Sequence, residues 1–226
     1  MKKGFFASYT GILIGINVII WLFFLIVSPP TVETIGGATG RVMGSFARNN
    51  IALQPSLILS GQKLWTFVTS MFMHSQVLWV HLIFNMISLM FLGGFVEKLI
   101  GKKRFLWLYL ASGLFAGILF VAVAALTGSG LNLYAVGASG AIFGLGGLLA
   151  VLTPRLPVLV FFIIPMPMWI AMVFLIVGLW VLGTGLGLPI GNVAHLGGLI
   201  VGVGYGFYLK KKYPRKTKMI SSYFAR

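Results

Sequence analysis

Four polar residues, Ser139, His195, His81 and Asn85, have side chains and spacings that a hydrolytic site could use. A serine hydroxyl becomes a good nucleophile when a histidine accepts its proton, and its attack on an amide or ester gives an acyl-enzyme. His81 and Asn85 are four residues apart, so in a helix they project from one face. These residue types indicate acyl transfer as a candidate chemistry.

The other ionisable residues exclude several alternatives. The chain has no Asp and no Cys, and its two Glu are Glu33 and Glu97. Hydrolysis by paired carboxylates, intramembrane aspartyl proteolysis, carboxylate metal clusters, thiolate catalysis and a carboxylate proton relay all lack their reagents. A Ser-His pair without a third carboxylate is the remaining arrangement of nucleophile and base, and no metal or cofactor is expected.

The elements that must position these residues are membrane helices. Hydrophobic residues make up 59% of the chain and charged residues 8%. The mean hydropathy is +1.03, so we expect an all-α polytopic membrane protein. The apolar runs predict six spans, at residues 9–27, 77–96, 105–126, 136–152, 156–181 and 190–209. Pro165 and Pro167 should kink the fifth span or delay its start.

Basic residues predict the orientation, because Lys and Arg beside spans stay on the cytoplasmic side. With both termini inside, all of the 17 basic residues except Arg41, Arg48 and Lys63 lie inside. The second, fourth and sixth spans then all run inward. Residues near their starts share a layer roughly 5 to 10 Å deep, at about 1.5 Å of rise per residue. The four polar residues all fall in that layer.

Small residues could bring two of these spans together. Glycine or alanine occupies positions 137, 140, 141 and 144 around Ser139, and glycine occupies 197, 198, 202 and 206 after His195. Such faces allow helices to approach closely. Each feature also has a purely structural interpretation, since small residues often only pack helices and buried His or Asn side chains often only bridge them.

The whole chain, residues 1–226, is predicted to form one domain. Residues 28–75 form a long outer loop whose apolar pieces should lie along the membrane surface. The basic tail, residues 210–226, is interpreted as a cytoplasmic anchor to the bilayer. We expect no nucleic-acid partner, because no aromatic-interleaved basic surface accompanies the tail. The sequence predicts no oligomeric state.

Three ordered motifs resemble those of the rhomboid family of intramembrane serine proteases. Gly137-Ala138-Ser139-Gly140 resembles the family's Gly-x-Ser-Gly motif. Ala194-His195-Leu196-Gly197-Gly198 resembles its histidine motif, and His81-Leu82-Ile83-Phe84-Asn85 its His-x-x-x-Asn motif. The similarity extends from about residue 50 to residue 206 and includes Met73-His74 and Gly93-x-x-x-Glu97-x-x-x-Gly101. Any one motif is weak, but the ordered set is specific.

The resemblance implies a bundle of six transmembrane helices with a cavity open to the outside. Ser139 would be the nucleophile, and His195 the general base and then the acid. Asn85, His81 and the Ser139 backbone amide would line an oxyanion hole. Transmembrane proteins would be the substrates, and a prokaryotic plasma membrane is the expected location.

Two positions depart from the family pattern. Trp65-Thr66 stands where the family often has Trp-Arg, so an arginine-centred loop network cannot form there. Phe143 stands where many members have Tyr, which keeps a ring that can stack near His195 but removes the hydroxyl. Neither change removes a candidate catalytic group.

Two other functions stay open at this point. A non-enzymatic rhomboid-like protein could bind membrane partners, although the presence of both Ser139 and His195 argues against it. A small transporter or channel could use the polar layer and the broken fifth span, although the absence of repeat symmetry and of intramembrane carboxylates weakens that alternative.

Overall fold

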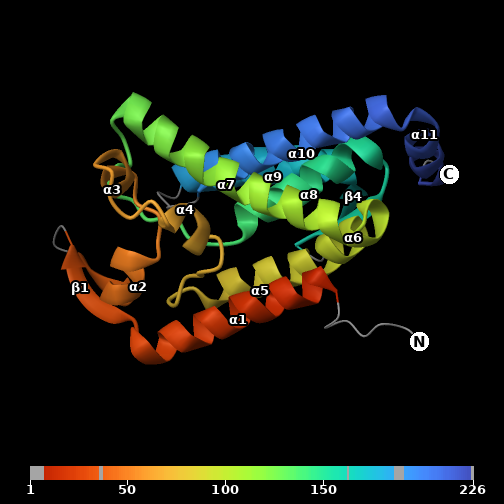
Figure 1. Ribbon diagram of the computed structural model, residues 1–226. Coiled ribbons are helices and arrows are strands. Elements are labelled where there is room, and N and C mark those ends of the chain that lie inside the picture. Colours follow the sequence, from red (N-terminus) through yellow and green to blue (C-terminus); the bar gives the residue numbers. More distant parts are fainter. Residues whose placement is uncertain (1–7, 36–37, 162, 186–190, 225–226) are drawn as a thin grey trace. The chain divides into compact units, whose positions relative to one another are not determined.

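The computed structural model describes residues 8–35, 38–161, 163–185 and 191–224. These residues are mostly helical, as Figure 1 shows. The chain divides into two compact units, each treated by itself below. The first contains Met1–Lys102 and Val121–Ser139, and the second contains Lys103–Phe120 and Gly140–Arg226.

The first unit begins with a long apolar helix and continues through the outer loop. Its elements are α1 (Tyr9–Val27), β1 (Thr31–Ile35), β2 (Ala38–Val42), α2 (Ser45–Asn50), α3 (Pro55–Leu59), α4 (Thr66–Thr69), α5 (Trp79–Ser88), the π-helix η2 (Leu89–Gly93) and α6 (Gly94–Ile100). The last three form one continuous helical segment, Trp79–Ile100. In Figure 1, α1 runs beside this segment.

The start of α1 is fixed by side chains that bind its free backbone amides. Ser8 accepts a hydrogen bond from the Gly11 amide. The Glu97 carboxylate on α6 accepts bonds from the Tyr9 amide at 3.0 Å, the Thr10 amide at 2.8 Å and the Thr10 hydroxyl at 2.7 Å. A carboxylate is well placed there, since the first amides of a helix lack partners and carry partial positive charge. Glu97 therefore holds α1 and α6 together.

The outer loop packs on the end of α1. Strands β1 and β2 pair antiparallel, with Thr31 opposite Val42. Phe24, Ala47 and Met73 form a buried hydrophobic cluster to which Val136 adds a partly buried side chain. Side chains from α1, α2 and the segment before α5 thus share one small core with the loop that precedes Ser139.

The second unit consists mainly of four helices and a hairpin. Its elements are α8 (Ser139–Leu152, from Gly140 onward), β3 (Pro157–Val160), β4 (Ile164–Pro167), α9 (Met168–Gly185), α10 (Asn192–Lys212) and α11 (Pro214–Tyr223). The long helix α7 (Lys102–Thr127) contributes residues to both units. Residues of α8 pack directly against α10 and against α7.

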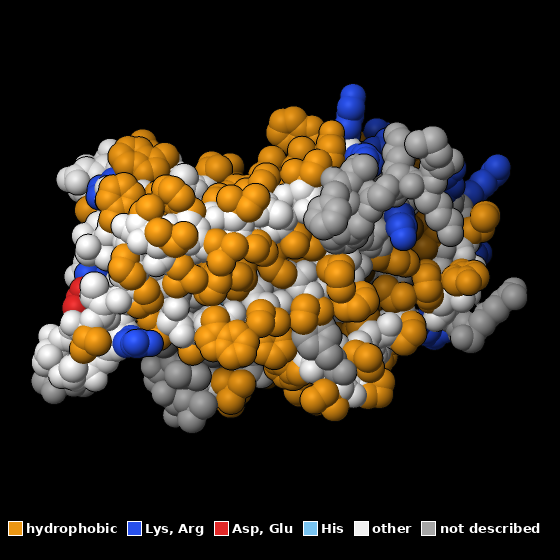
Figure 2. All heavy atoms as spheres, turned by 90° about the horizontal axis from the view of Figure 1, so that it is seen from below, with side chains coloured by type: hydrophobic (Ala, Val, Ile, Leu, Met, Phe, Trp, Pro, Cys, Tyr) orange, Lys and Arg blue, Asp and Glu red, His pale blue; other side chains and the backbone are white. Residues whose placement is uncertain are grey.

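Four helical segments are long and apolar enough to cross a membrane: Tyr9–Val27, Trp79–Ile100, Lys102–Thr127 and Asn192–Lys212. The apolar segments Ser139–Leu152 and Met168–Gly183 are shorter. Side chains such as Ile26 (80% exposed), Trp107 (73%) and Leu126 (86%) lie on the surface. Figure 2 shows apolar side chains over most of the face drawn, as expected for helices that contact lipid.

The fifth span, predicted at residues 156–181, begins late, as Pro165 and Pro167 indicated, and the hairpin before it was not predicted. Residues Pro157–Val160 pair antiparallel with Ile164–Pro167, and α9 begins only at Met168. Pro157, Pro165 and Pro167 explain this late start, because proline lacks the amide hydrogen that a helix interior needs.

Other predicted bounds also differ by a few residues. The second span was predicted at residues 77–96 and is helical over Trp79–Ile100, and the third was predicted at 105–126 and is helical over Lys102–Thr127. The fourth span starts at Ser139 rather than residue 136, since Gly137 has φ +123°, which a helix does not allow. The sixth was predicted from residue 190, which lies outside the described residues; α10 begins at Asn192 and continues to Lys212. The predicted tail, residues 210–226, contains a further helix, α11.

Candidate active site

Ser139 is the first residue of α8 and is partly exposed. The loop before it is held by backbone pairing: Leu53 and Ala135 exchange hydrogen bonds of 3.0 and 2.9 Å, and the Ser56 amide donates to the Leu131 carbonyl at 2.9 Å. The Gly137 amide donates to the Ser70 carbonyl at 2.9 Å. These contacts lie within the first unit and fix the path of the chain into Ser139.

Gly137 allows His81 to approach this loop. A Cβ atom at Gly137 would lie 2.8 Å from His81 Cε1 and 3.0 Å from His81 Nε2, and 3.8 Å from the Ser139 hydroxyl oxygen. The His81 ring and the Ser139 hydroxyl are therefore both close to one point beside Gly137. The positive φ and this contact together require glycine.

Asn85 lies one helical turn after His81 on α5, as its spacing predicts. Its side-chain nitrogen donates to the His81 carbonyl at 2.8 Å, and the side chain is buried, with 6% exposed. An amide nitrogen carries two hydrogens, so the other one is available for a second acceptor. Within the first unit, Ser139, His81 and Asn85 thus lie on adjoining segments.

His74 also contacts the loop before Ser139, a contact that the sequence did not predict. Its side chain is fully buried, and its Nε2 accepts a long hydrogen bond, 3.4 Å, from the Ala138 amide. The rings of His74 and His81 have centroids 5.2 Å apart. Burial first, and then the nearby His81, lower the pKa of His74 to about 3, so the imidazole is neutral at pH 7. A neutral ring is required for Nε2 to accept a bond.

His195 lies in the first turns of α10 and is buried, with 9% exposed. The Phe143 ring of α8 stacks on its imidazole, with centroids 4.5 Å apart and an angle of 18° between the planes. This confirms that Phe143 keeps a ring able to stack near His195. The stack fixes the plane of the imidazole relative to α8.

Glycines let α8 and α10 approach closely beside His195. A Cβ atom at Gly198 would lie 1.8 Å from the Gly140 carbonyl oxygen, and one at Gly202 would lie 1.8 Å from the Gly144 carbonyl oxygen. No side chain fits at either point, so backbone packs on backbone. The expectation that the two small-residue faces pack together is confirmed.

The candidate residues thus fall into two groups. In the first unit, His81 approaches the loop before Ser139, His74 bonds to Ala138 in that loop, and Asn85 bonds to the His81 carbonyl. His195 is placed in the second unit, against Phe143. The pairing of Ser139 with His195 joins residues of different units and stays a prediction.

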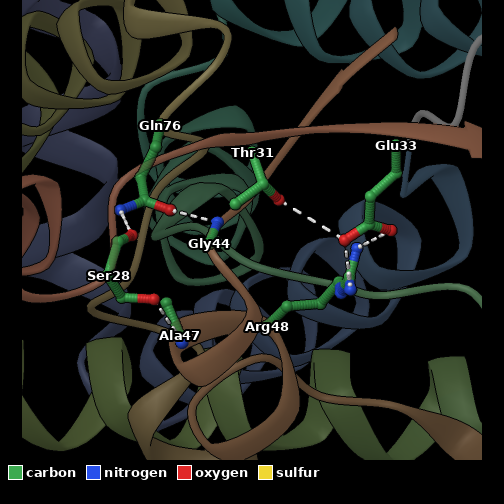
Figure 3. Close-up of polar contacts among 7 residues, drawn as sticks. All are labelled: Ser28, Thr31, Glu33, Gly44, Ala47, Arg48 and Gln76. Atoms are coloured by element: carbon green, nitrogen blue, oxygen red, sulfur yellow. Dashed lines mark hydrogen bonds and ion pairs between the residues drawn. The ribbon is translucent and has the colours of Figure 1, made fainter. Parts of the chain in front are cut away.

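A buried polar network fixes the outer loop near His74 (Figure 3). Gln76 donates from its side-chain nitrogen to the Ser28 carbonyl at 2.7 Å, and its oxygen accepts from the Gly44 amide at 3.0 Å. The same nitrogen donates to the Phe24 carbonyl at 2.6 Å. The Ser28 hydroxyl accepts from the Ala47 amide at 3.1 Å. One side chain therefore ties the end of α1 and the start of α2 to the segment that carries His74.

An ion pair between Arg48 and Glu33 links two further segments of the outer loop. Arg48 makes two 2.9 Å hydrogen bonds to the Glu33 carboxylate, as Figure 3 shows. The pKa of Glu33 is lowered chiefly by these bonds. The Arg48 guanidinium also lies 5.8 Å from the centroid of the Tyr134 ring, in the loop before Ser139. An arginine network is therefore present in the outer loop, although not at Trp65-Thr66.

At Trp65-Thr66, hydrogen bonds to backbone carbonyls take the place of an arginine network. The Trp65 indole donates to the Asn50 carbonyl at 2.9 Å, and the Thr66 hydroxyl donates to the Lys63 carbonyl at 2.7 Å. The Lys63 ammonium in turn binds the Asn49 carbonyl and the Asn50 side chain.

Among the described residues, no group of three or more His, Cys, Asp or Glu side chains is arranged to hold a metal ion.

Comparison with known proteins finds the family model described as "Rhomboid domain" over residues 61–212. The chain is 36% identical over 156 residues to "Rhomboid protein 1, mitochondrial" of Saccharomyces cerevisiae, which covers 65% of this chain and 42% of that protein. It is 28% identical over 135 residues to "Putative rhomboid protease YdcA" of Bacillus subtilis, covering 60% and 57%. It is 32% identical over 149 residues to "Rhomboid protease GlpG" of Yersinia pestis, covering 65% and 48%.

The chain spans about half the length of the curated relatives that it matches. The matched domain contains all four candidate residues, Ser139, His195, His81 and Asn85. It covers more than half of the chain, so the resemblance found in the motifs is confirmed. The chain belongs to the rhomboid family.

Proposed function

We propose that this protein is an intramembrane serine endopeptidase that cleaves transmembrane segments of other proteins near the outer membrane face. The observation that carries the proposal is the setting of Ser139 at the start of α8, in a loop packed against His81 and His74. The names of relatives such as "Rhomboid protease GlpG" support the same activity.

His195 is the proposed general base. Ser139 and Phe143 are four residues apart in α8 and share a helical face, and the Phe143 ring stacks on His195. This spacing supports a Ser139–His195 pair. His195 would accept the proton of Ser139 during attack and donate it to the leaving amine, and water would then hydrolyse the acyl-enzyme with His195 as base again.

The oxyanion of the tetrahedral intermediate needs donors in fixed positions. The Ser139 amide is one candidate, because it lies at the start of α8, where the helix carries partial positive charge. Asn85 and His81 are the side-chain candidates: His81 lies beside the Ser139 loop, and Asn85 is one helical turn further along α5. Each such donor typically contributes about 2.7–4 kcal/mol to the stabilisation of the transition state.

The proposed topology has six spans with both termini in the cytoplasm of a prokaryotic cell. The short apolar helices α8 and α9 would be the fourth and fifth spans, and the basic residues outside the outer loop would face the cytoplasm. In this topology the start of α8 faces outward, so water reaches Ser139 by a short path. Substrates would be membrane proteins whose helix unwinds before cleavage.

The test is cleavage of a reporter transmembrane protein by the full chain in proteoliposomes. Wild type and Ser129→Ala, a change in the exposed loop before Ser139, should release the labelled product, whereas Ser139→Ala and His195→Ala should release none. The reporter span should be cleaved faster when it contains Gly or Pro, since backbone must leave its helical hydrogen bonds before attack. Cleavage by folded Ser139→Ala protein would overturn the mechanism. Folded wild type inactive on all reporters would favour a non-enzymatic binding role.

A further inference from the structure

A hollow lined by two lysines lies at the end of α10, where the chain turns into α11. It has a volume of about 430 Å³. It is lined by Lys210, Pro214, Thr217, Lys218, Ser221 and Ser222. Two lysines, one threonine and two serines therefore line one space, directly after a helix long and apolar enough to cross a membrane.

The positive charge of this hollow is not balanced within its unit. The chain's two carboxylate side chains, Glu33 and Glu97, both belong to the first unit, where Arg48 and Thr10 bind them. Neither Lys210 nor Lys218 forms an ion pair with any described residue. Two cations facing one hollow without a counter-charge favour an anionic ligand.

Several cationic and hydroxyl groups near the hollow already form hydrogen bonds within the protein, so fewer groups remain to bind a ligand. Lys212 donates to the Tyr208 hydroxyl at 2.8 Å, and the Thr217 hydroxyl bonds to the carbonyls of Tyr213 and Pro214 at 3.0 and 3.1 Å, closing the turn between α10 and α11. Ser222 donates to the Met219 carbonyl at 2.9 Å. The Lys210 ammonium lies 6.0 Å from the centroid of the Phe207 ring, a contact that leaves its hydrogens able to bind a ligand. Lys210, Lys218 and Ser221 are thus the groups best able to bind a ligand.

The opposite face of α11 indicates where the ligand comes from. Met219 and Tyr223 are four residues apart, so they share a face, and 73% and 75% of their side chains are exposed. Phe207 on α10 is also exposed, at 59%. An amphipathic helix with bare apolar side chains, joined to a membrane span, fits the interface of a bilayer, where its lysines reach the headgroups.

We propose that the hollow binds the phosphate group of an anionic phospholipid. Lys210 and Lys218 neutralise the phosphate, and the Ser221 hydroxyl donates a hydrogen bond to it. Met219 and Tyr223, on the opposite face of α11, contact the bilayer about one helix diameter away from the phosphate. This site is separate from the proposed protease chemistry and does not depend on it.

The test is native mass spectrometry of the full chain in detergent, titrated with phosphatidylglycerol or phosphatidylcholine. The variant Lys210→Gln/Lys218→Gln removes both cations of the hollow. The matched control Lys211→Gln/Lys216→Gln removes the same charge from exposed positions of the same two helices that do not line it. Circular dichroism of each variant checks that it is folded.

We expect the affinity of the first bound phosphatidylglycerol to fall about tenfold or more in Lys210→Gln/Lys218→Gln, because both lysines of the proposed phosphate site are lost. It should fall by less than about twofold in the control, because Lys211 and Lys216 do not line the hollow. Phosphatidylcholine should bind weakly to all three proteins. Equal losses in both double variants would show unspecific charge attraction and overturn the proposal. Full displacement of the lipid by millimolar inorganic phosphate would assign the hollow to free phosphate and also overturn it.

Discussion

The outer loop of the first unit and the α8–α10 pair of the second unit hold candidate catalytic groups by different means. Near His74, buried side chains bind backbone groups: Gln76 makes three hydrogen bonds and His74 accepts one from Ala138. Near His195, two glycines of α10 lie directly on two carbonyls of α8. One region is held by polar partners and the other by close contact between backbones.

This difference predicts how each region fails. A polar region loses stability when a partner is removed or changes its protonation, because the remaining group stays buried without a hydrogen bond. A glycine-packed region tolerates no added atom, because the two backbones must separate. Substitutions and changes of pH can therefore distinguish the region held by hydrogen bonds from the region held by glycine packing.

The largest expected effect is that of one methyl group between α8 and α10. The Cβ atom of Gly202→Ala would lie 1.8 Å from the Gly144 carbonyl oxygen, so α10 must shift. A shift of about 1 Å at His195 should reduce reporter cleavage about 100-fold. Gly204→Ala on the same helix is the control, since its Cβ meets nothing within 4 Å. Equal activity of the two variants would contradict glycine packing.

Acid should weaken the polar region through His74. Its pKa is about 3 in the folded protein and 6.5 as the ordinary value, so below pH 6.5 the unfolded chain binds a proton that the folded chain does not. The stability contribution is complete above pH 6.5 and falls as the pH drops toward 3, by roughly 3 kcal/mol at about pH 4. Thermal unfolding across this range should show a steeper acid loss in wild type than in His74→Asn. Parallel curves would refute a neutral, buried His74.

Removing the hydrogen bonds of Gln76 should lower the free energy of unfolding by somewhat less than acid does through His74. Gln76→Leu keeps the approximate size but leaves the Gly44 amide and the carbonyls of Phe24 and Ser28 without this partner. We expect the melting temperature to fall by an amount equivalent to about 2 kcal/mol. Gln62→Leu, at an exposed position of the same outer loop, should have little effect. A harmless Gln76→Leu would mean that the hydrophobic cluster alone holds the loop.

The smallest expected effect concerns the ring stacked on His195. Phe143→Leu removes the stack but keeps an apolar side chain. The free energy of unfolding should fall by about 0.5–1.5 kcal/mol. Because the imidazole plane would be less well fixed, kcat should fall about threefold to tenfold with little change in KM. Phe174→Leu, on the exposed surface of α9, is the matched substitution and should leave both constants unchanged.

The glycine-held region could be predicted from the sequence because its signal is local and periodic. Gly198 and Gly202 recur at four-residue spacing, and the matching small residues 140 and 144 follow Ser139 at the same period. Close helix contact follows from that pattern alone. The ordered motifs around Ser139, His195 and His81 identified the family for the same reason.

The polar region could not be predicted in this way. Gln76 is linked to Ser28 and Gly44 across 48 and 32 positions, and no period connects such residues. His74 was recognised as part of a motif, but its bond to Ala138 spans 64 positions. The hairpin β3–β4 was missed because its apolar composition resembles that of a span, although the prolines indicated the late start of α9.

The central claim is that Ser139 is a nucleophile activated by His195, and covalent labelling tests it most directly. A fluorophosphonate should react with the full chain in proteoliposomes, forming a phosphorus–oxygen bond with loss of fluoride. Peptide mass spectrometry should find the adduct on Ser139 in wild type, and folded His195→Ala protein should be labelled at least about 100-fold more slowly. An adduct on another serine, or undiminished labelling of Ser139 in His195→Ala, would contradict the account.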